Sequence, residues 1–99
     1  MLTAFLQKAI ELNADSLEIE YKDREELVTA FHGSLGFGIG SVGSEKRDEL
    51  FEDLEQLRKS RRATVQGVVY RLSFSETESF GETVYRIRWK QEDRPQRSK

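Results

Sequence analysis

The spacing of apolar residues changes along the chain, and each change marks an expected element. Between residues 2 and 13 apolar side chains recur every three or four positions, which is typical of an amphipathic helix. Asn13 readily adopts the left-handed conformation that ends helices, so we expect the helix to stop there. The period then falls to two, and the alternation of Leu17, Ile19 and Tyr21 with polar residues predicts a half-buried strand.

A polar turn over residues 22–25 leads into a second β-prone run, residues 27–31, so the two strands form a hairpin. Between Gly33 and Gly43 glycines alternate with large apolar residues. If this segment is a strand, we expect its bulky side to pack on the helices and its glycine side to stay flat for another chain. The bulky residues are Leu35, Phe37 and Ile39, and the glycines between and beside them are Gly36, Gly38 and Gly40. The alternative is a mobile loop that links the sheet to the next helix.

The second half of the chain repeats the change from helix to strand. Ser44 stands where it can cap a second helix, which we expect to run to about Lys59. The apolar stripe of that helix comprises Leu50, Phe51, Leu54 and Leu57, and its other faces are acidic. Period-two segments over 63–66, 68–75 and 83–90 predict three strands, with a tight turn at Gly67 and a loop over 76–81.

This order, α-β-β-(β)-α-β-β-β, predicts a single α+β domain over residues 1–90. Two helices packed on one face of a mostly antiparallel sheet are the natural arrangement of such elements. We expect Phe51, Tyr70 and Trp89 to share one core. Residues 91–99 are polar and contain Pro95, so we expect a disordered tail.

Composition narrows the classes of function. The chain has no cysteine and one histidine, which excludes disulfides and thiolate zinc sites, and we expect neither a metal nor a cofactor. A net charge of -2 gives no overall attraction to nucleic acid or membranes. There is no signal-peptide pattern and no apolar run of the ~20 residues that span a bilayer, so we expect a cytoplasmic location without membrane insertion. No G-x-x-x-x-G-K-[ST] motif occurs, and we expect no enzymatic activity and no catalytic residues.

The glycine segment also carries a phosphate-binding pattern. Residues 38–43 match G-x-G-x-x-G and precede a helix, whose N-terminus favours anions. No acidic residue closes a following strand, as a dinucleotide-binding unit requires. Binding of a small ligand or nucleotide phosphate at residues 36–43 is therefore an alternative to a structural role. His32 near Ser34 lacks an acidic residue to orient it, and we interpret it as structural.

Charged residues alternate on what we expect to be the outer face of the sheet. Glu18 and Glu20 lie on one strand, and Arg71, Arg86 and Arg88 lie on two others. Cross-strand pairing explains this pattern more simply than a metal or acid–base site. Nucleic-acid binding through these arginines and the basic tail is an alternative, although we expect no base-stacking platform because the aromatic residues are assigned to the core.

Three segments then carry a resemblance. Residues 14–20 read Ala-Asp-Ser-Leu-Glu-Ile-Glu, residues 27–33 end in His-Gly, and residues 80–87 read Phe-Gly-Glu-Thr-Val-Tyr-Arg-Ile. In this order, after an opening helix, they resemble the small N-terminal domain of type II secretion and type IV pilus ATPases. That domain carries Ala-Ser-Asp-Ile-His-Ile-Glu, a strand ending in Asp-Gly, and Gly-Glu before a strand ending in Arg-Ile or Arg-Leu. The resemblance covers residues 2–89.

The resemblance implies a free-standing bacterial relative of a regulatory domain, without the ATPase domain. The family's nucleotide-contacting arginines would fall on Val28 and Ala30, so that role does not carry over. We therefore expect a non-catalytic protein-interaction or regulatory module linked to secretion or pilus systems, with an unidentified protein partner or a second copy of itself. The expected interaction surface comprises Gly36, Gly38, Gly40, Glu18, Glu20, Arg71, Arg86 and Arg88.

Overall fold

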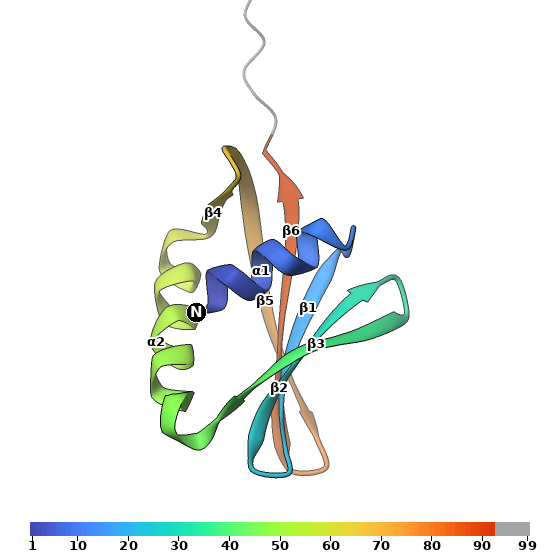
Figure 1. The fold of residues 1–99 in the computed structure, drawn as a ribbon, viewed down its shortest axis with the longest axis vertical. Helices are drawn as coiled ribbons and strands as arrows, with labels where there is room; N and C mark the ends of the chain where they lie inside the picture. Colours follow the sequence, from blue (N-terminus) through green and yellow to red (C-terminus); the bar gives the residue numbers. More distant parts are fainter. Residues whose placement is uncertain (93–99) are drawn as a thin grey trace, which may run out of the picture.

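Alternating helices and hairpins build one layered unit over residues 1–92, the part of the chain that the computed structural model describes. The elements are α1 (Leu2–Glu11), β1 (Ser16–Lys22), β2 (Glu25–His32), β3 (Leu35–Gly43), a 3-10 turn (Ser44–Lys46), α2 (Arg47–Ser60), β4 (Arg62–Val65), β5 (Val68–Ser79) and β6 (Glu82–Gln91). Within this range six antiparallel strands form one sheet in the order β3-β2-β1-β6-β5-β4. Both helices lie on the same side of the curled sheet (Figure 1). The predicted fold class is confirmed.

Tight turns set the hairpins. The turns at Asp23-Arg24, Gln66-Gly67 and Phe80-Gly81 each have two residues with positive φ. This backbone geometry matches the right-handed twist of the flanking strands. The predicted loop over 76–81 is wrong, because β5 continues to Ser79 and the turn needs only two residues. The polar residues of this segment are typical of a loop, which is why the sequence predicted one. In the structure, cross-strand pairing with β6 extends the strand through them.

Helix α1 ends in the expected left-handed turn. Asn13 has φ 64°, and its N–H donates to Ile10 O over 2.9 Å, while Ala14 N–H donates to Ala9 O over 3.0 Å. These two bonds satisfy carbonyl groups that the last helical turn leaves unpaired. The helix proper stops at Glu11, two residues before the predicted end.

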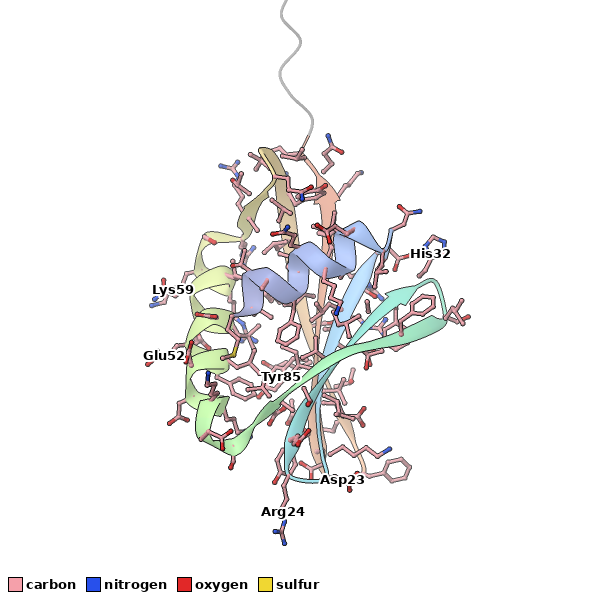
Figure 2. The ribbon with its side chains drawn as sticks, in the orientation of Figure 1. Asp23, Arg24, His32, Glu52, Lys59 and Tyr85 are labelled. Carbon is pink, nitrogen blue, oxygen red and sulfur yellow. The ribbon has the colours of Figure 1, made fainter. Side chains whose placement is uncertain are left out.

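The core lies between the helices and the covered face of the sheet. Its fully buried side chains come from both helices and from three of the strands: Leu2, Leu6, Leu50, Leu17, Ile19, Val28 and Ile87. Burial of each such side chain stabilises the fold by about 1.5–3 kcal/mol. Phe51, Tyr70 and Trp89 pack against this cluster, so the predicted shared core is confirmed. Phe51 meets the edge of Tyr85 at 5.3 Å between ring centroids, and Tyr85 lies between α2 and the sheet (Figure 2).

The start of α2 is held differently from the prediction. Ser44 makes no side-chain cap hydrogen bond, and a 3-10 turn precedes the helix. Arg47 instead donates from Nε to Glu26 Oε2 over 2.7 Å, and its guanidinium lies 5.5 Å from the Tyr21 ring centroid and 5.2 Å from that of Phe51. Glu26 is only 2% exposed, so this contact pairs a buried carboxylate.

The C-terminal boundary shifts slightly. Strand β6 includes Gln91, one residue beyond the predicted end of the domain at residue 90. Residues 93–99, which form most of the predicted tail and include Pro95, lie outside the described residues.

Candidate interaction surfaces

The sheet face opposite the helices carries all the charged strand residues that the sequence singled out. Side chains alternate along each strand, so residues paired across strands share a face. Arg86 is directly opposite Glu18 on β1, and Arg88 is opposite Ser16 on β1 and Ser73 on β5. Glu20 and Arg71 belong to the same face. We call it the uncovered face.

Glu18, Arg86 and Phe31 form a stack in the middle of the uncovered face. Arg86 forms an ion pair with Glu18, and its guanidinium lies 5.4 Å from the Phe31 ring centroid. The predicted cross-strand charge pairing is confirmed for this pair. It is not repeated at Glu20, whose cross-strand neighbours are Leu27 and Val84.

A row of cations crosses one end of the uncovered face. Arg62, Arg71 and Lys90 are in register on β4, β5 and β6. Like charges directly opposite each other destabilise a sheet. Glu92 offsets part of this repulsion, with its Oε2 3.1 Å from Arg62 and 3.4 Å from Arg71. Strand register brings Arg62 and Lys90 next to Arg71, a proximity that the sequence does not reveal.

The glycine segment is β3, an edge strand with a β-bulge. Val28 pairs with Gly40 and Thr29 with Gly38, so Ile39 is an extra residue between the pairs. The bulge shifts the alternation. Ile39 is buried, whereas Leu35 and Phe37 are 60% and 42% exposed, so the expectation that all three pack on the helices is wrong for two of them.

The bulge also divides the glycines between the two faces. A Cβ on Gly40 would lie 2.6 Å from the Phe5 ring of α1, which places Gly40 on the helix side. A Cβ on Gly36 would meet the Phe31 ring at 2.8 Å, on the uncovered face, and one on Gly38 would meet nothing within 4 Å. Gly40 therefore does not share the surface of Gly36 and Gly38, contrary to the predicted grouping.

Residues 38–43 are not a phosphate loop in this fold. Gly38, Gly40 and Gly43 belong to the extended strand β3, and none of them has a positive φ. A phosphate cradle needs consecutive N–H groups that converge, whereas N–H groups alternate in direction along a strand. A Cβ at Gly43 would lie 2.5 Å from a carboxylate oxygen of Glu45, a group that repels anions.

The free edge of β3 exposes the backbone of glycine residues. The Phe31 carbonyl accepts a hydrogen bond from the N–H of Asp15, the residue before β1, so the N–H and C=O groups of Phe31 face β1. Because directions alternate, Ala30 faces β3 and pairs there with Phe37. Gly36 and Gly38, on either side of Phe37, then direct their N–H and C=O groups away from the sheet. Since β3 ends the strand order, no strand of residues 1–92 lies beyond them.

Exposed apolar side chains gather beside this edge. Leu12, 48% exposed, precedes Asn13, whose carbonyl lies 2.8 Å from His32 Nδ1. His32 is the cross-strand partner of Leu35. The segments that carry Leu12, Leu35 and Phe37 therefore meet at one corner, where Figure 2 shows His32 near the end of the β2–β3 hairpin. We call these three residues the apolar corner.

His32 has a structural role in this arrangement. His32 Nδ1 contacts the Asn13 carbonyl, and the N–H of the adjacent Gly33 donates to Asp15 Oδ2 over 2.9 Å. The two bonds join the β2–β3 turn to the segment after α1. They do not direct His32 toward Ser34 for base catalysis, in agreement with the interpretation from the sequence.

The opposite edge of the sheet is charged. Strand β4 covers only residues 68–71 of β5, and the rest of β5 is flanked by a hollow lined by Arg58, Arg61 and Glu76, among others. Arg58 Nη2 lies 2.9 Å from Glu76 Oε2. Leu72 N–H donates to Arg61 O, so Phe74 and Glu76 also direct their peptide groups outward.

One carboxylate has a shifted pKa, and it lies away from both edges. Asp53 of α2 accepts a hydrogen bond from Leu2 N–H over 2.9 Å, and the Met1 amino group lies 3.1 Å away. These contacts favour the charged form and lower the pKa of Asp53, the Leu2 bond being the larger cause. Asp53 thus caps the start of α1, where the sequence offers no local cap.

The described residues contain no cluster of three or more His, Asp or Glu side chains suited to a metal ion. Likewise, neither α1 nor α2 has the length and apolarity needed to cross a bilayer. Searches against protein-family models and curated protein sequences find no match for this chain.

Proposed function

We propose that this protein is a non-catalytic protein-interaction module, and that an extended, uncharged segment of a partner adds as a strand to the free edge of β3. The observation that carries the proposal is an edge strand that lacks charge. No charged residue and no proline occurs from Gly33 to Ser44, in a chain of which 34% is charged. Natural sheets guard their edges with charges, prolines, bulges or a covering element, because unguarded edges pair with other chains. Of these devices β3 has the bulge at Ile39, which leaves the segment before it, Leu35 to Gly38, unguarded.

The chemistry of docking follows from the backbone. A partner strand would exchange N–H···O=C bonds with Gly36 and Gly38, which carry no side chain to obstruct its approach. The apolar corner would supply hydrophobic contacts on the helix side of the new strand. Because backbone groups provide the pairing, selectivity would come from the side chains that meet Leu35 and Phe37.

The resemblance of three sequence segments to secretion and pilus ATPase domains supplies the setting. In that setting the module regulates a bacterial secretion or pilus assembly and does not hydrolyse nucleotide.

The docking edge can be tested with an uncharged, β-prone hexapeptide. Titration into ¹⁵N-labelled protein should shift the amide resonances of Gly36, Gly38 and Ser41 and leave those of Phe74 and Glu76 unchanged. The matched control is the same peptide N-methylated at every residue, which removes the N–H groups of both of its edges. Equal shifts with both peptides, or shifts confined to β5, would exclude strand addition at β3.

A second candidate function rests on the cation row. Arg62, Arg71 and Lys90 could bind a phosphate-bearing chain such as single-stranded nucleic acid, with the Phe31 ring on the same face. Binding of a labelled oligonucleotide should weaken steeply with salt, and Arg71→Gln should reduce that salt dependence. Arg24→Gln is the matched control, since Arg24 lies at the far turn of the sheet (Figure 2). If Arg71→Gln changes neither the affinity for the oligonucleotide nor its salt dependence, this binding site is excluded.

A further inference from the structure

We infer that the strand received by β3 is β3 of a second copy of this chain, paired antiparallel about a two-fold axis at Phe37. The inference rests on the proposed function, because it requires β3 to be the docking edge. It goes further by naming the partner and the register of the pair.

The outward backbone groups are compatible with this register. Gly36 and Gly38 flank Phe37 and direct their N–H and C=O groups away from the sheet. A two-fold axis at Phe37 places Gly36 opposite Gly38 of the second copy, and the reverse. In an antiparallel pair these become hydrogen-bonded positions that exchange both N–H···O=C bonds.

The side chains fit the same register. Phe37 would face Phe37 of the second copy at a non-hydrogen-bonded position, where opposing side chains approach most closely. Cross-strand aromatic pairs are favourable. Leu35 follows on the same side, so the pair would cover two side chains that are 42% and 60% exposed in one copy. On the uncovered face a Cβ at Gly38 would meet nothing within 4 Å, so the second strand finds no obstruction there.

The charge pattern favours a second copy at this edge. A strand that pairs with itself brings identical residues together, and β3 contains no charged residue that could repel its own copy. The β5 edge behaves in the opposite way, because Glu76 lies there beside Arg58 and Arg61, and a second strand would have to desolvate these charges. A two-fold pair is also closed, so each copy uses its β3 edge once and association stops at a dimer.

Sedimentation velocity of the full chain across a concentration series tests the inference. The wild type should show a monomer–dimer equilibrium. Phe37→Glu places like charges across the axis and should raise the dissociation constant at least about tenfold. Gly38→Pro removes an outward N–H, a position where an edge strand tolerates proline, and should have a similar effect.

Matched controls separate the edge from general effects. Gly38→Ala keeps the N–H, and Phe80→Glu makes the same side-chain change at the exposed β5–β6 turn, where Phe80 contacts no core. Both should change the dissociation constant by less than about twofold. Circular dichroism and thermal unfolding identify any variant that fails to fold, and the inference is judged on the others.

Amide hydrogen exchange supplies a readout of the register. Protection of Gly36 and Gly38 should rise with protein concentration, while Phe37, whose N–H faces β2, should be protected at every concentration. A monomer throughout the series, or a dimer that Phe37→Glu and Gly38→Pro leave intact, would overturn the inference. If the protein stays monomeric but the hexapeptide still shifts Gly36 and Gly38, the inference fails while the proposed function stands. If neither occurs, both fail.

Discussion

The two edges of the sheet are built in opposite ways. At the β5 edge, peptide groups face outward beside Arg58, Arg61 and Glu76, and the short strand β4 covers part of the length. At the β3 edge, peptide groups face outward at glycines, beside exposed Leu35 and Phe37. Charge makes an edge costly to pair because a partner strand must desolvate it, whereas glycine and apolar residues make pairing easy. The comparison therefore identifies β3 as the edge that is available to a partner.

We expect the largest change in unfolding free energy from breaking the ion pair near the β3 edge, compared with the ion pair near the β5 edge. Arg47→Met leaves the buried Glu26 carboxylate without its partner beside the end of β3. Because the Arg47 side chain is itself 52% exposed, water replaces part of the lost contact, and we expect the unfolding free energy to fall by about 2 kcal/mol. Arg58→Met is the same change near the β5 edge. Its pair with Glu76 is solvent-exposed, so we expect a loss below about 1 kcal/mol. Chemical denaturation of both variants measures the difference.

The same pair of variants shows which edge loosens first. Amides of β3 should lose protection in Arg47→Met before those of β5. Equal losses of stability in the two variants would contradict the contrast between the buried carboxylate of Glu26 and the exposed carboxylate of Glu76.

We expect a change in stability of intermediate size from substituting alanine for two glycines of β3. A Cβ at Gly40 lies 2.6 Å from the Phe5 ring, so Gly40→Ala should force that ring to move and cost about 1–2 kcal/mol. Gly38→Ala has open space and no positive φ, so it should be neutral or stabilise by up to about 1 kcal/mol through the unfolded state. Thermal unfolding of the two variants checks the sign. A stabilised Gly40→Ala would show that the bulge does not place Gly40 under α1.

We expect the smallest change in stability from Asp53, which lies in the helix layer, and its substitution should leave both edges of the sheet unchanged. The pKa of Asp53 is lowered in the folded state, so its carboxylate stabilises the fold at neutral pH. That contribution is lost as the pH falls through the lowered pKa. Asp53→Asn should therefore be less stable than the wild type near neutral pH, and the gap should narrow in acid. The side chain is 35% exposed, so we expect a gap below about 1 kcal/mol.

Unfolding free energies of the two proteins between about pH 3 and pH 7 test this prediction. A gap that widens in acid would reverse the sign assigned to Asp53. The edge amides of β3 should exchange equally in both proteins, because Asp53 supports the start of α1 and not β3.

Local pattern was sufficient for most of the fold. Alternation predicted β1 and the inward side of β6, and Asn13 predicted the end of α1, because each depends on neighbours within a few residues. The same reasoning failed at residues 76–81, where polar residues looked like a loop. There, pairing with β6 decides the structure: Glu76 pairs with Tyr85 and Ser79 with Glu82. The polar composition of the segment does not reveal this pairing.

The candidate surface was predicted only in part. Glu18 and Arg86 were assigned to one face and form an ion pair across β1 and β6. The glycines were expected to share one face, but the extra residue at Ile39 moves Gly40 to the other. Leu12 lies within the helix predicted over residues 2–13, but α1 ends at Glu11 and the Leu12 side chain is 48% exposed.

The sequence by itself determined the α+β fold class and the absence of charge from Gly33 to Ser44, because composition and periodicity are properties of the chain alone. Only the tertiary structure decided that this uncharged segment is an edge strand, that its outward peptide groups belong to Gly36 and Gly38, and that Leu35 and Phe37 lie beyond the cover of α1. The physical reason is that strand order and register are long-range pairings. A bulge of one residue changes which side chains face the core, and the periodicity of a single strand does not reveal where its partner will place that bulge.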